Sequence, residues 1–220
     1  ALQLSEQPYE VTPHYLYSRE YGFDTSNYTL SGLSLNFVYD SRDNLINDFK
    51  GYFINVNYRY NPEFLGSSKN SSSLWVEFRT YVGVSKKVPR HLVAFWFFGN
   101  IQVSGQQPYM TLMALGEDQR ARSGRGYIAG RYRGENYLYG EVEYRFPISR
   151  CSRLLGGVLF VNANTVSNKS NNVSLFDHIR PGAGFGLRIM LNKHFRTNIN
   201  IDFAIGKKSQ GFYFSGTETF

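Results

Sequence analysis

Charged and apolar side chains alternate between Tyr137 and Phe146, where the chain reads Y-L-Y-G-E-V-E-Y-R-F. Two carboxylates this close together, Glu141 and Glu143, could work as a general acid and base. Arg145, however, falls on the same side of a two-residue period. An arginine beside two carboxylates is typical of ion-paired residues on one face of a strand. No Ser/His/Asp or Cys/His set is visible in the sequence, so we expect no enzymatic role.

A second candidate for chemistry is an arginine in the long stretch 105–134. Arg125 lies in the tetrad G-R-G-Y, which spans Gly124 to Tyr127. Gly124 and Gly126 allow the backbone to turn tightly and to approach another surface closely. A guanidinium forms paired, charge-assisted bonds with carboxylates. We therefore expect this loop to be drawn to an acidic strand face; the alternative is a solvated arginine in a surface loop.

The remaining polar candidates favour structural roles. Asp40, Arg42 and Asp43 lie in Y-D-S-R-D-N, where aspartate side chains bond to nearby backbone amides and tighten a turn. A structural turn is therefore favoured over a ligand or metal site. The four histidines of the chain show no metal-ligand spacing. The sequence predicts neither a metal nor a cofactor.

The alternation of apolar and polar residues recurs along the chain and predicts strands. Ten are expected, at about 8–18, 28–40, 51–62, 73–86, 91–104, 135–148, 154–167, 179–192, 195–206 and 210–220. Most are longer than the strands of soluble sheets and long enough to cross a bilayer at a tilt. The chain is 17% aromatic, and many of these rings fall near strand ends, as interfacial girdles require. The pattern predicts an all-β, transmembrane, antiparallel up-and-down β-barrel; a soluble sandwich or lipocalin-like barrel is the alternative.

The expected organisation is one barrel preceded by a short segment. Residues 1–27 are expected to form an N-terminal segment whose weak first strand is interrupted by Pro13. Residues 28–220 are expected to form the barrel, with both ends of the chain on the side of the short turns. The net charge is +7, but the arginines are dispersed singly, which argues against nucleic-acid binding. The single cysteine, Cys151, excludes an internal disulfide.

Several motifs in order along residues 28–220 carry a family resemblance. They are G-L-S-L-N-F-V-Y-D-S-R-D-N followed by F-K-G-Y, the G-R-G-Y tetrad, G-E-V-E-Y-R-F-P, and a terminal Phe. Together they resemble the BamA/TamA superfamily of Gram-negative outer-membrane barrels, also called bacterial surface antigens. The resemblance implies proteins that insert other barrels into the outer membrane or move polypeptides across it.

The resemblance also implies roles for single residues. The long loop would fold into the lumen and dock its tip, Gly124 to Tyr127, on the wall; Gly124 stands where the family usually has valine. The implied partners on the lumen wall are Gly140, Glu141, Glu143 and Asn162. Asn162 replaces an expected aspartate, which leaves Glu143 as the anionic partner of Arg125. Phe212, Phe214 and Phe220 resemble the C-terminal signal by which such barrels are recognised.

The implied function is mechanical and needs no cofactor. A seam between the first and last strands would open to client outer-membrane proteins or secreted polypeptides, in contact with outer-membrane lipid. Family barrels have sixteen strands and carry periplasmic POTRA modules, whereas ten strands and no such module are read here. The chain is therefore expected to be the C-terminal part of a longer barrel or a small stand-alone one, with envelope-complex subunits or a second copy as further partners. The alternative function is a small pore or structural barrel without insertase activity.

Overall fold

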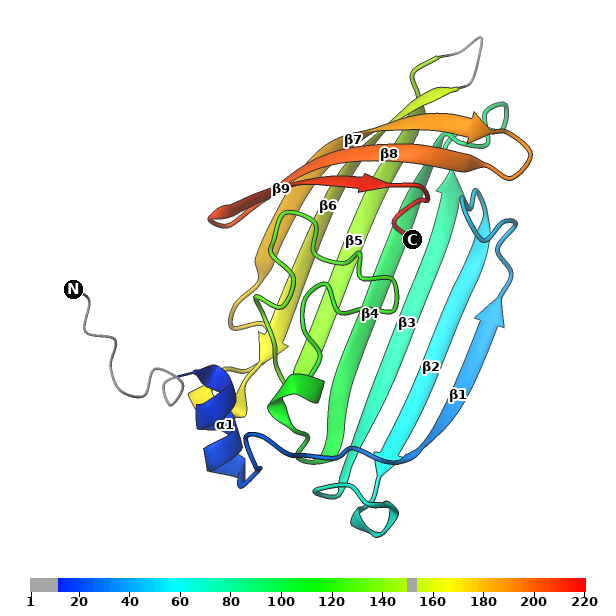
Figure 1. The fold of residues 1–220 in the computed structure, drawn as a ribbon. Helices are drawn as coiled ribbons and strands as arrows, with labels where there is room; N and C mark the ends of the chain where they lie inside the picture. The colour runs from blue at the N-terminus through cyan, green and yellow to red at the C-terminus, as the bar shows by residue number, and fades with distance from the viewer. Residues whose placement is uncertain (1–11, 150–153) are drawn as a thin grey trace, which may run out of the picture.

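One curled antiparallel sheet forms the wall of the molecule (Figure 1). The computed structural model describes residues 12–149 and 154–220, and in this part of the chain the sheet has nine strands, each paired only with its neighbours in sequence. The strands are β1 (Leu33–Asp40), β2 (Gly51–Asn61), β3 (Ser71–Gly83), β4 (Leu92–Gly105), β5 (Asn136–Pro147), β6 (Leu155–Ser167), β7 (Arg180–Asn192), β8 (Thr197–Gly206) and β9 (Ser209–Ser215). This order confirms the predicted fold class. Within the described residues β1 and β9 are edge strands that do not pair with each other.

The sheet has a loop end and a turn end. The loop end carries the connections 62–70, 106–135, 168–179 and 207–208, and the turn end carries 41–50, 84–91, 148–154 and 193–196. Because the nine strands are odd in number, β1 and β9 run in the same direction. The described residues before β1 therefore lie at the loop end, and those after β9 lie at the turn end. The prediction that both ends lie on the same side is wrong for this part of the chain.

The two faces of the sheet differ as the alternation predicted. On β5, Glu141 and Glu143 point inward and are 2% and 0% exposed. The opposite parity of the strands points outward and is apolar, as expected for a lipid-facing surface. This outward row includes Phe97, Leu159, Val161, Phe185, Ile201, Ile205, Phe212 and Phe214. The same two-residue period places Gly140 on the outer face, where a Cβ atom would meet Phe97. Gly140 is thus not a lumen-wall partner, and that prediction is wrong.

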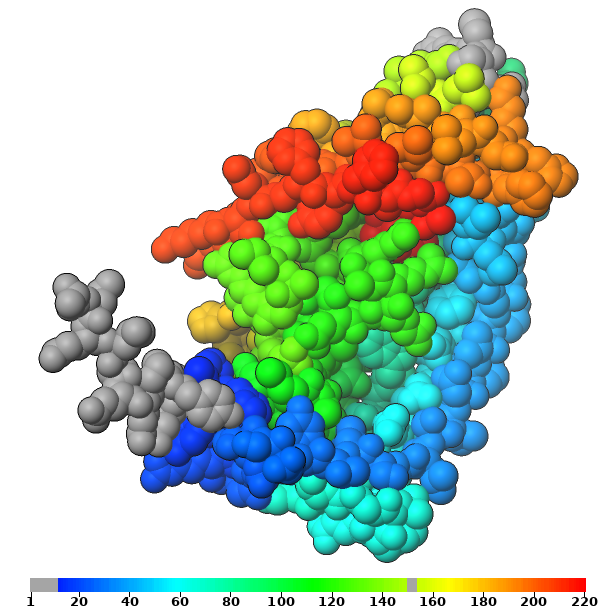
Figure 2. Space-filling model, viewed as in Figure 1, coloured from blue at the N-terminus to red at the C-terminus, as the bar shows by residue number. Residues whose placement is uncertain are grey.

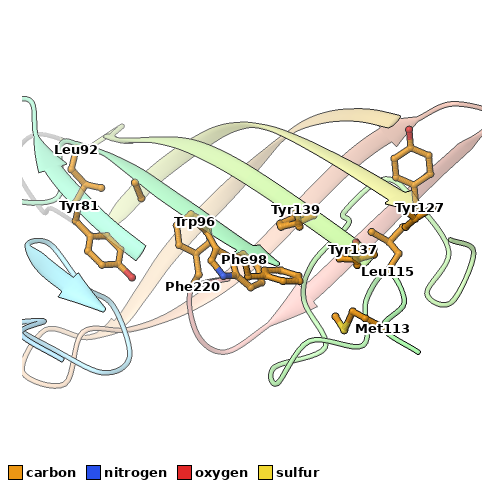
Figure 3. Packing of buried hydrophobic residues seen from close by; sticks show 12 residues of the cluster. Tyr81, Leu92, Trp96, Phe98, Met113, Leu115, Tyr127, Tyr137, Tyr139 and Phe220 are labelled. Carbon is orange, nitrogen blue, oxygen red and sulfur yellow. The ribbon is translucent and has the colours of Figure 1, made fainter. Parts of the chain in front are cut away.

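Part of the interior is aromatic rather than ionic (Figure 3). Trp96 and Phe98 from β4 pack with Tyr139 from β5, with ring centroids 5.1–5.3 Å apart. Phe220 joins this cluster, with its ring centroid 5.2 Å from that of Trp96. β9 ends at Ser215, and the residues after it turn inward, so Phe220 is only 1% exposed. The predicted strand 210–220 is therefore too long, and Phe220 does not share the outward face of Phe212 and Phe214.

The described part of the predicted first strand is a helix, α1 (Pro13–Tyr21). Thr12 caps it by accepting a hydrogen bond from the Tyr15 amide at 3.3 Å, and Gly22 ends it with a φ of 64°. Pro13, which argued against a regular strand, fits the first turn of a helix, where its missing N–H is not needed. Residues 8–11 of that predicted strand, like Cys151, lie outside the described residues.

Short 3-10 helices lie in three of the connections at the loop end. They are η2 (Glu63–Leu65), η3 (Tyr109–Thr111) and η4 (Lys169–Asn171). Every helical segment of the described residues falls short of the length and hydrophobicity that a membrane-spanning helix requires. Tyr17 of α1 packs against Tyr109, which joins the helix to the base of the longest connection.

Candidate functional site

The connection between β4 and β5, residues 106–135 and hereafter the long loop, turns into the hollow of the sheet. Its atoms fill the space beneath β9 in Figure 2. Arg125 near its tip is 3% exposed and meets three carboxylates from two strands. Its Nη1 lies 2.7 Å from Asp202 of β8, and its Nη2 binds both Glu141 and Glu143 of β5. The long loop is therefore clamped between two walls of the lumen.

Two further contacts hold Arg125 in place. Its guanidinium lies over the ring of Phe160, 3.4 Å from the centroid, and its carbonyl oxygen accepts a hydrogen bond of 3.0 Å from the Asn162 amide. Burying a cation is costly unless opposite charges and hydrogen bonds surround it. Here β6 supplies the ring and the amide, while β5 and β8 supply the charges.

The two glycines beside Arg125 let the tip lie flat on the wall. Gly124 and Gly126 have φ angles of 77° and 98°, which are left-handed and favour glycine. A Cβ atom on Gly126 would lie 2.8 Å from the backbone of Ile205. The freed amides donate to phenol oxygens, Gly124 to Tyr139 at 3.0 Å and Gly126 to Tyr213 at 2.8 Å. The tip thus contacts β5 through one tyrosine and β9 through the other.

Tyr127 fastens the tip to the loop end of the last strands. Its hydroxyl donates to the carbonyl oxygen of Pro181 on β7 and accepts from the amide of Lys207 at 3.1 Å. Tyr127 is 5% exposed, and its ring occupies the space that a side chain on Gly206 would need. Each member of the tetrad Gly124–Tyr127 therefore bonds to the wall.

The charges around Arg125 extend to the residues that follow β9. Arg145 donates to Glu143 at 2.7 Å, and Arg188 pairs with Asp202 and, at 2.8 Å, with Glu218. Burial raises the pKa of Glu218, but the charges of Arg188 and Arg145 outweigh burial and hold it below its usual range. Arg145 also donates to the main-chain oxygen of Phe220 at 3.1 Å. The same network therefore holds both the long loop and residues 216–220 inside the sheet.

β9 leaves one edge of the sheet open. It pairs with β8 on one side only, so its other row of backbone N–H and C=O groups faces away from the described sheet. A cavity of 460 Å³ lies between β9 and the long loop. Phe212, Tyr213, Phe214 and Ser215 line it on the strand side. On the loop side it is lined by residues from Gly116 to Ala129, including Arg125.

Residues 2–220 match the Omp85 superfamily domain. The chain belongs to the Omp85 superfamily. Its fold is similar to that of BamA from Haemophilus ducreyi in a crystal structure lacking POTRA domains 1–3, with a TM-score of 0.65 and 17% sequence identity. That match covers 84% of this chain but 40% of the BamA chain, so the chain spans about two fifths of that length. A comparison with curated proteins finds no match.

Proteins of the Omp85 superfamily are generally involved in inserting or translocating other proteins at the outer membrane. Several sequence-based expectations agree with the contacts of this Omp85 domain. Arg125 meets Glu143, as expected, and also Glu141. Asn162 contacts Arg125 as well, but through the carbonyl oxygen rather than the guanidinium.

Asp202 is the partner that sequence reasoning missed. It supplies the carboxylate that Asn162 lacks, from a strand two positions further along the sheet. The alternation along 195–206 places Asp202 on the polar, inward-facing side of the strand, and Asp202 is the only acidic residue in that stretch. The missing information was the curl of the sheet, which brings β8 opposite β5 across the long loop.

The turn motif of this Omp85 domain has the local bonds that were expected. Asp43 accepts from the amide of Phe49 at 2.9 Å, and Arg42 pairs with Asp40 at 2.7 Å. Asp43 also makes a long-range ion pair, 2.7 Å to Arg196 in the connection 193–196. Burial raises the pKa of Asp43, but Arg196 and the backbone amides outweigh burial and hold it below its usual range.

Phe212 and Phe214, two members of the expected C-terminal signal, are 80% and 74% exposed on the outer face of β9. Their side chains therefore point in the direction expected for contact with lipid. Their role as a recognition signal stays a prediction. Phe220, the third member, contacts Trp96 and Tyr81 in the interior instead.

Proposed function

We propose that this chain is part of an outer-membrane barrel that helps other barrel proteins to insert, or passes polypeptides across, through a seam at β9. The observation that carries this proposal is the free edge of β9 beside a cavity whose opposite wall is the clamped long loop. An exposed strand edge binds an extended segment through backbone hydrogen bonds. No covalent chemistry or cofactor is required for that step.

The rest of the barrel wall would come from further strands. An antiparallel barrel closes only with an even number of strands, and β1 and β9 run in the same direction. An odd number of additional strands must therefore lie between them. We propose that these strands belong to the same polypeptide, in line with the 40% coverage of the BamA chain. Envelope-complex subunits and a second copy of the chain are alternative sources.

The clamped long loop would give the seam a firm inner wall. Arg125 fixes the loop to β5 and β8, while Tyr213 of β9 is held by the amide of Gly126. A client strand entering at β9 therefore meets backbone groups on one side and an ordered loop on the other. Phe212 and Phe214 would keep the outer face of β9 in contact with lipid as the strand arrives.

Reconstitution tests the proposal directly. The purified protein would be placed in liposomes, and insertion of an unfolded test barrel would be scored by protease protection and by its heat-dependent gel mobility. We expect faster insertion than in empty liposomes, and loss of that gain in Arg125→Ala. Conductance across the same membranes without any gain in insertion would instead support the small-pore alternative. A lumen filled by the long loop is a reason to expect little conductance.

A further inference from the structure

One arginine of the long loop, Arg120, has no partner for its guanidinium among the described residues. Only its backbone amide is bonded, to Asp118. The other arginines of the loop all donate from their guanidinium groups: Arg122 to the carbonyl oxygens of Thr217 and Glu218, Arg125 to three carboxylates, Arg131 to the carbonyl oxygen of Lys207, and Arg133 to Glu117. A partly buried cation without an ion pair is a candidate for binding an anion.

The surroundings of Arg120 strengthen this interpretation. It is half-buried and lines the cavity between the long loop and β9. Burial lowers the pKa of Arg120, and the nearby charges of Arg79 and Arg42 lower it further, while Tyr81 and Asp48 oppose this shift only in part. These two neighbours are already neutralised, Arg79 by Glu77 and Arg42 by two aspartates. Asp48, a carboxylate near Arg120, is already paired with Arg42, so Arg120 is a partly buried cation without an ion pair of its own in the described part of the chain.

The cavity is shaped for an extended polypeptide. One wall is the free edge of β9, whose backbone groups can pair with a strand. A strand that pairs antiparallel to β9 enters the cavity from the turn end and runs toward the loop end. Arg120 lies on the turn-end side, because Arg42 of the connection 41–50 is among its charged neighbours. A side chain reaching Arg120 would thus come from near the N-terminal end of the entering strand.

We propose that this cavity binds an extended client strand antiparallel to β9, and that Arg120 pairs with an acidic side chain near the N-terminal end of that strand. The proposal rests on the proposed function, because it names a feature of the polypeptide that enters the seam. Arg120 is then a specificity-determining residue. Arg120 favours strands whose lumen-facing side chain at that position is a carboxylate over strands with an amide there.

Paired peptides test the proposal. Two ten-residue strand peptides, both acetylated and amidated at their ends, would differ only by glutamate or glutamine at a lumen-facing position near the N-terminal end. Binding to the detergent-solubilised protein would be followed by fluorescence anisotropy. A charge-assisted bond in a partly buried site corresponds to roughly 10- to 100-fold in affinity. We expect the glutamate peptide to bind tighter by that factor, and Arg120→Gln to abolish the difference.

Arg131→Gln is the matched control, because Arg131 is an exposed arginine of the same loop that does not line the cavity. We expect it to keep the preference for glutamate. Arg120→Lys, which retains the charge, should keep part of the preference and guards against a folding defect in the glutamine variant. Equal binding of both peptides by the unmodified protein would overturn the role of Arg120 while leaving strand pairing intact. Failure of both peptides to bind would overturn the proposed seam itself.

Discussion

Replacing Arg125 with alanine removes the one cation that joins the long loop to both β5 and β8. The loop tip would keep its other contacts with the wall, including those of the Gly126 amide and the Tyr127 hydroxyl. It would lose all three ion pairs and the contact with the ring of Phe160. The change therefore separates the ion pairs of Arg125 from the uncharged hydrogen bonds of the tip.

The burial of the partners of Arg125 sets how much docking free energy the loop loses in Arg125→Ala. Glu141 and Glu143 are almost completely buried, and one of their cations would be gone. Breaking a buried ion pair by removing one partner costs about 3–5 kcal/mol. Because about 1.4 kcal/mol corresponds to a factor of ten, we expect the released form of the loop to become roughly 10²- to 5 × 10³-fold more populated. The sheet should persist, because Arg125 contributes no strand hydrogen bond.

The rate of cleavage by trypsin measures how often the long loop is released. The bond after Arg122 is protected, because the Arg122 guanidinium is bound to residues 217 and 218 and Ser123 is buried. When opening is fast relative to cleavage, the cleavage rate follows the open population. We therefore expect cleavage at Arg122 to accelerate by about the factor above, with an unchanged circular dichroism spectrum. Arg131→Ala is the control, since exposed substitutions usually change stability by less than about 0.5 kcal/mol.

Two results would refute this reasoning. If Arg125→Ala were cleaved no faster than Arg131→Ala, the ion pairs would contribute nothing to docking. If the variant lost its strand signal, Arg125 would be supporting the sheet rather than the loop. A third variant, Arg125→Lys, checks the geometry, because a single ammonium group cannot reproduce the bonds of the guanidinium to three carboxylates. It should fall between the other two.

Three further predictions use the same protease assay or a pH titration. Gly126→Ala should release the loop more than Gly130→Ala. Alanine costs about 1–2 kcal/mol at either position, because both have a left-handed backbone. A Cβ atom on residue 126 would also lie 2.8 Å from backbone atoms, whereas a Cβ atom on residue 130 would meet nothing within 4 Å. Equal rates would show that the close approach is unimportant. Asp202→Asn should destabilise the docked loop by about 1–3 kcal/mol. This is less than in Arg125→Ala, because Arg125 still pairs with Glu141 and Glu143 in the Asp202 variant. A larger release of the loop than in Arg125→Ala would contradict this. The arginine neighbours of Glu218 lower its pKa against the effect of burial. Its contribution to stability is therefore fully present above the ordinary glutamate pKa of 4.5 and is lost as the pH falls through the lowered pKa of the folded protein. Tryptophan fluorescence should therefore change on acidification in the unmodified protein, and Glu218→Gln should reduce that change.

The alternation of side chains predicted most of the barrel wall from the sequence. The inward direction of Glu141 and Glu143, and the loop drawn toward them, needed only the two-residue period and the charge of Arg125. These features are local or depend on a simple attraction between opposite charges. Strand boundaries were less accurate where the alternation continued beyond the pairing, as after Ser215.

Features that depend on the curl of the sheet could not be predicted in this way. Asp202 meets Arg125 only because β8 comes round to face β5 across the long loop. Phe220 reaches the interior because the chain leaves the sheet after β9, which no periodicity indicates. Helix α1 is different, because its signals were present: Thr12 before Pro13 and a glycine at its end are typical of helix boundaries. The expectation of another barrel strand outweighed them.

The ion pair between Asp43 and Arg196 joins connections that are far apart around the sheet. Arg196 also lies over the ring of Phe49, 4.3 Å from its centroid, and its carbonyl oxygen accepts from Asn47. Within the described residues, the flank that begins with β1 and the flank that contains β7 and β8 are thus joined directly at the turn end. If these two flanks separate, they must rotate about this contact at the turn end, so the gap between them is widest at the loop end. An engineered disulfide between the flanks at the turn end would still allow this rotation, whereas one at the loop end would prevent it.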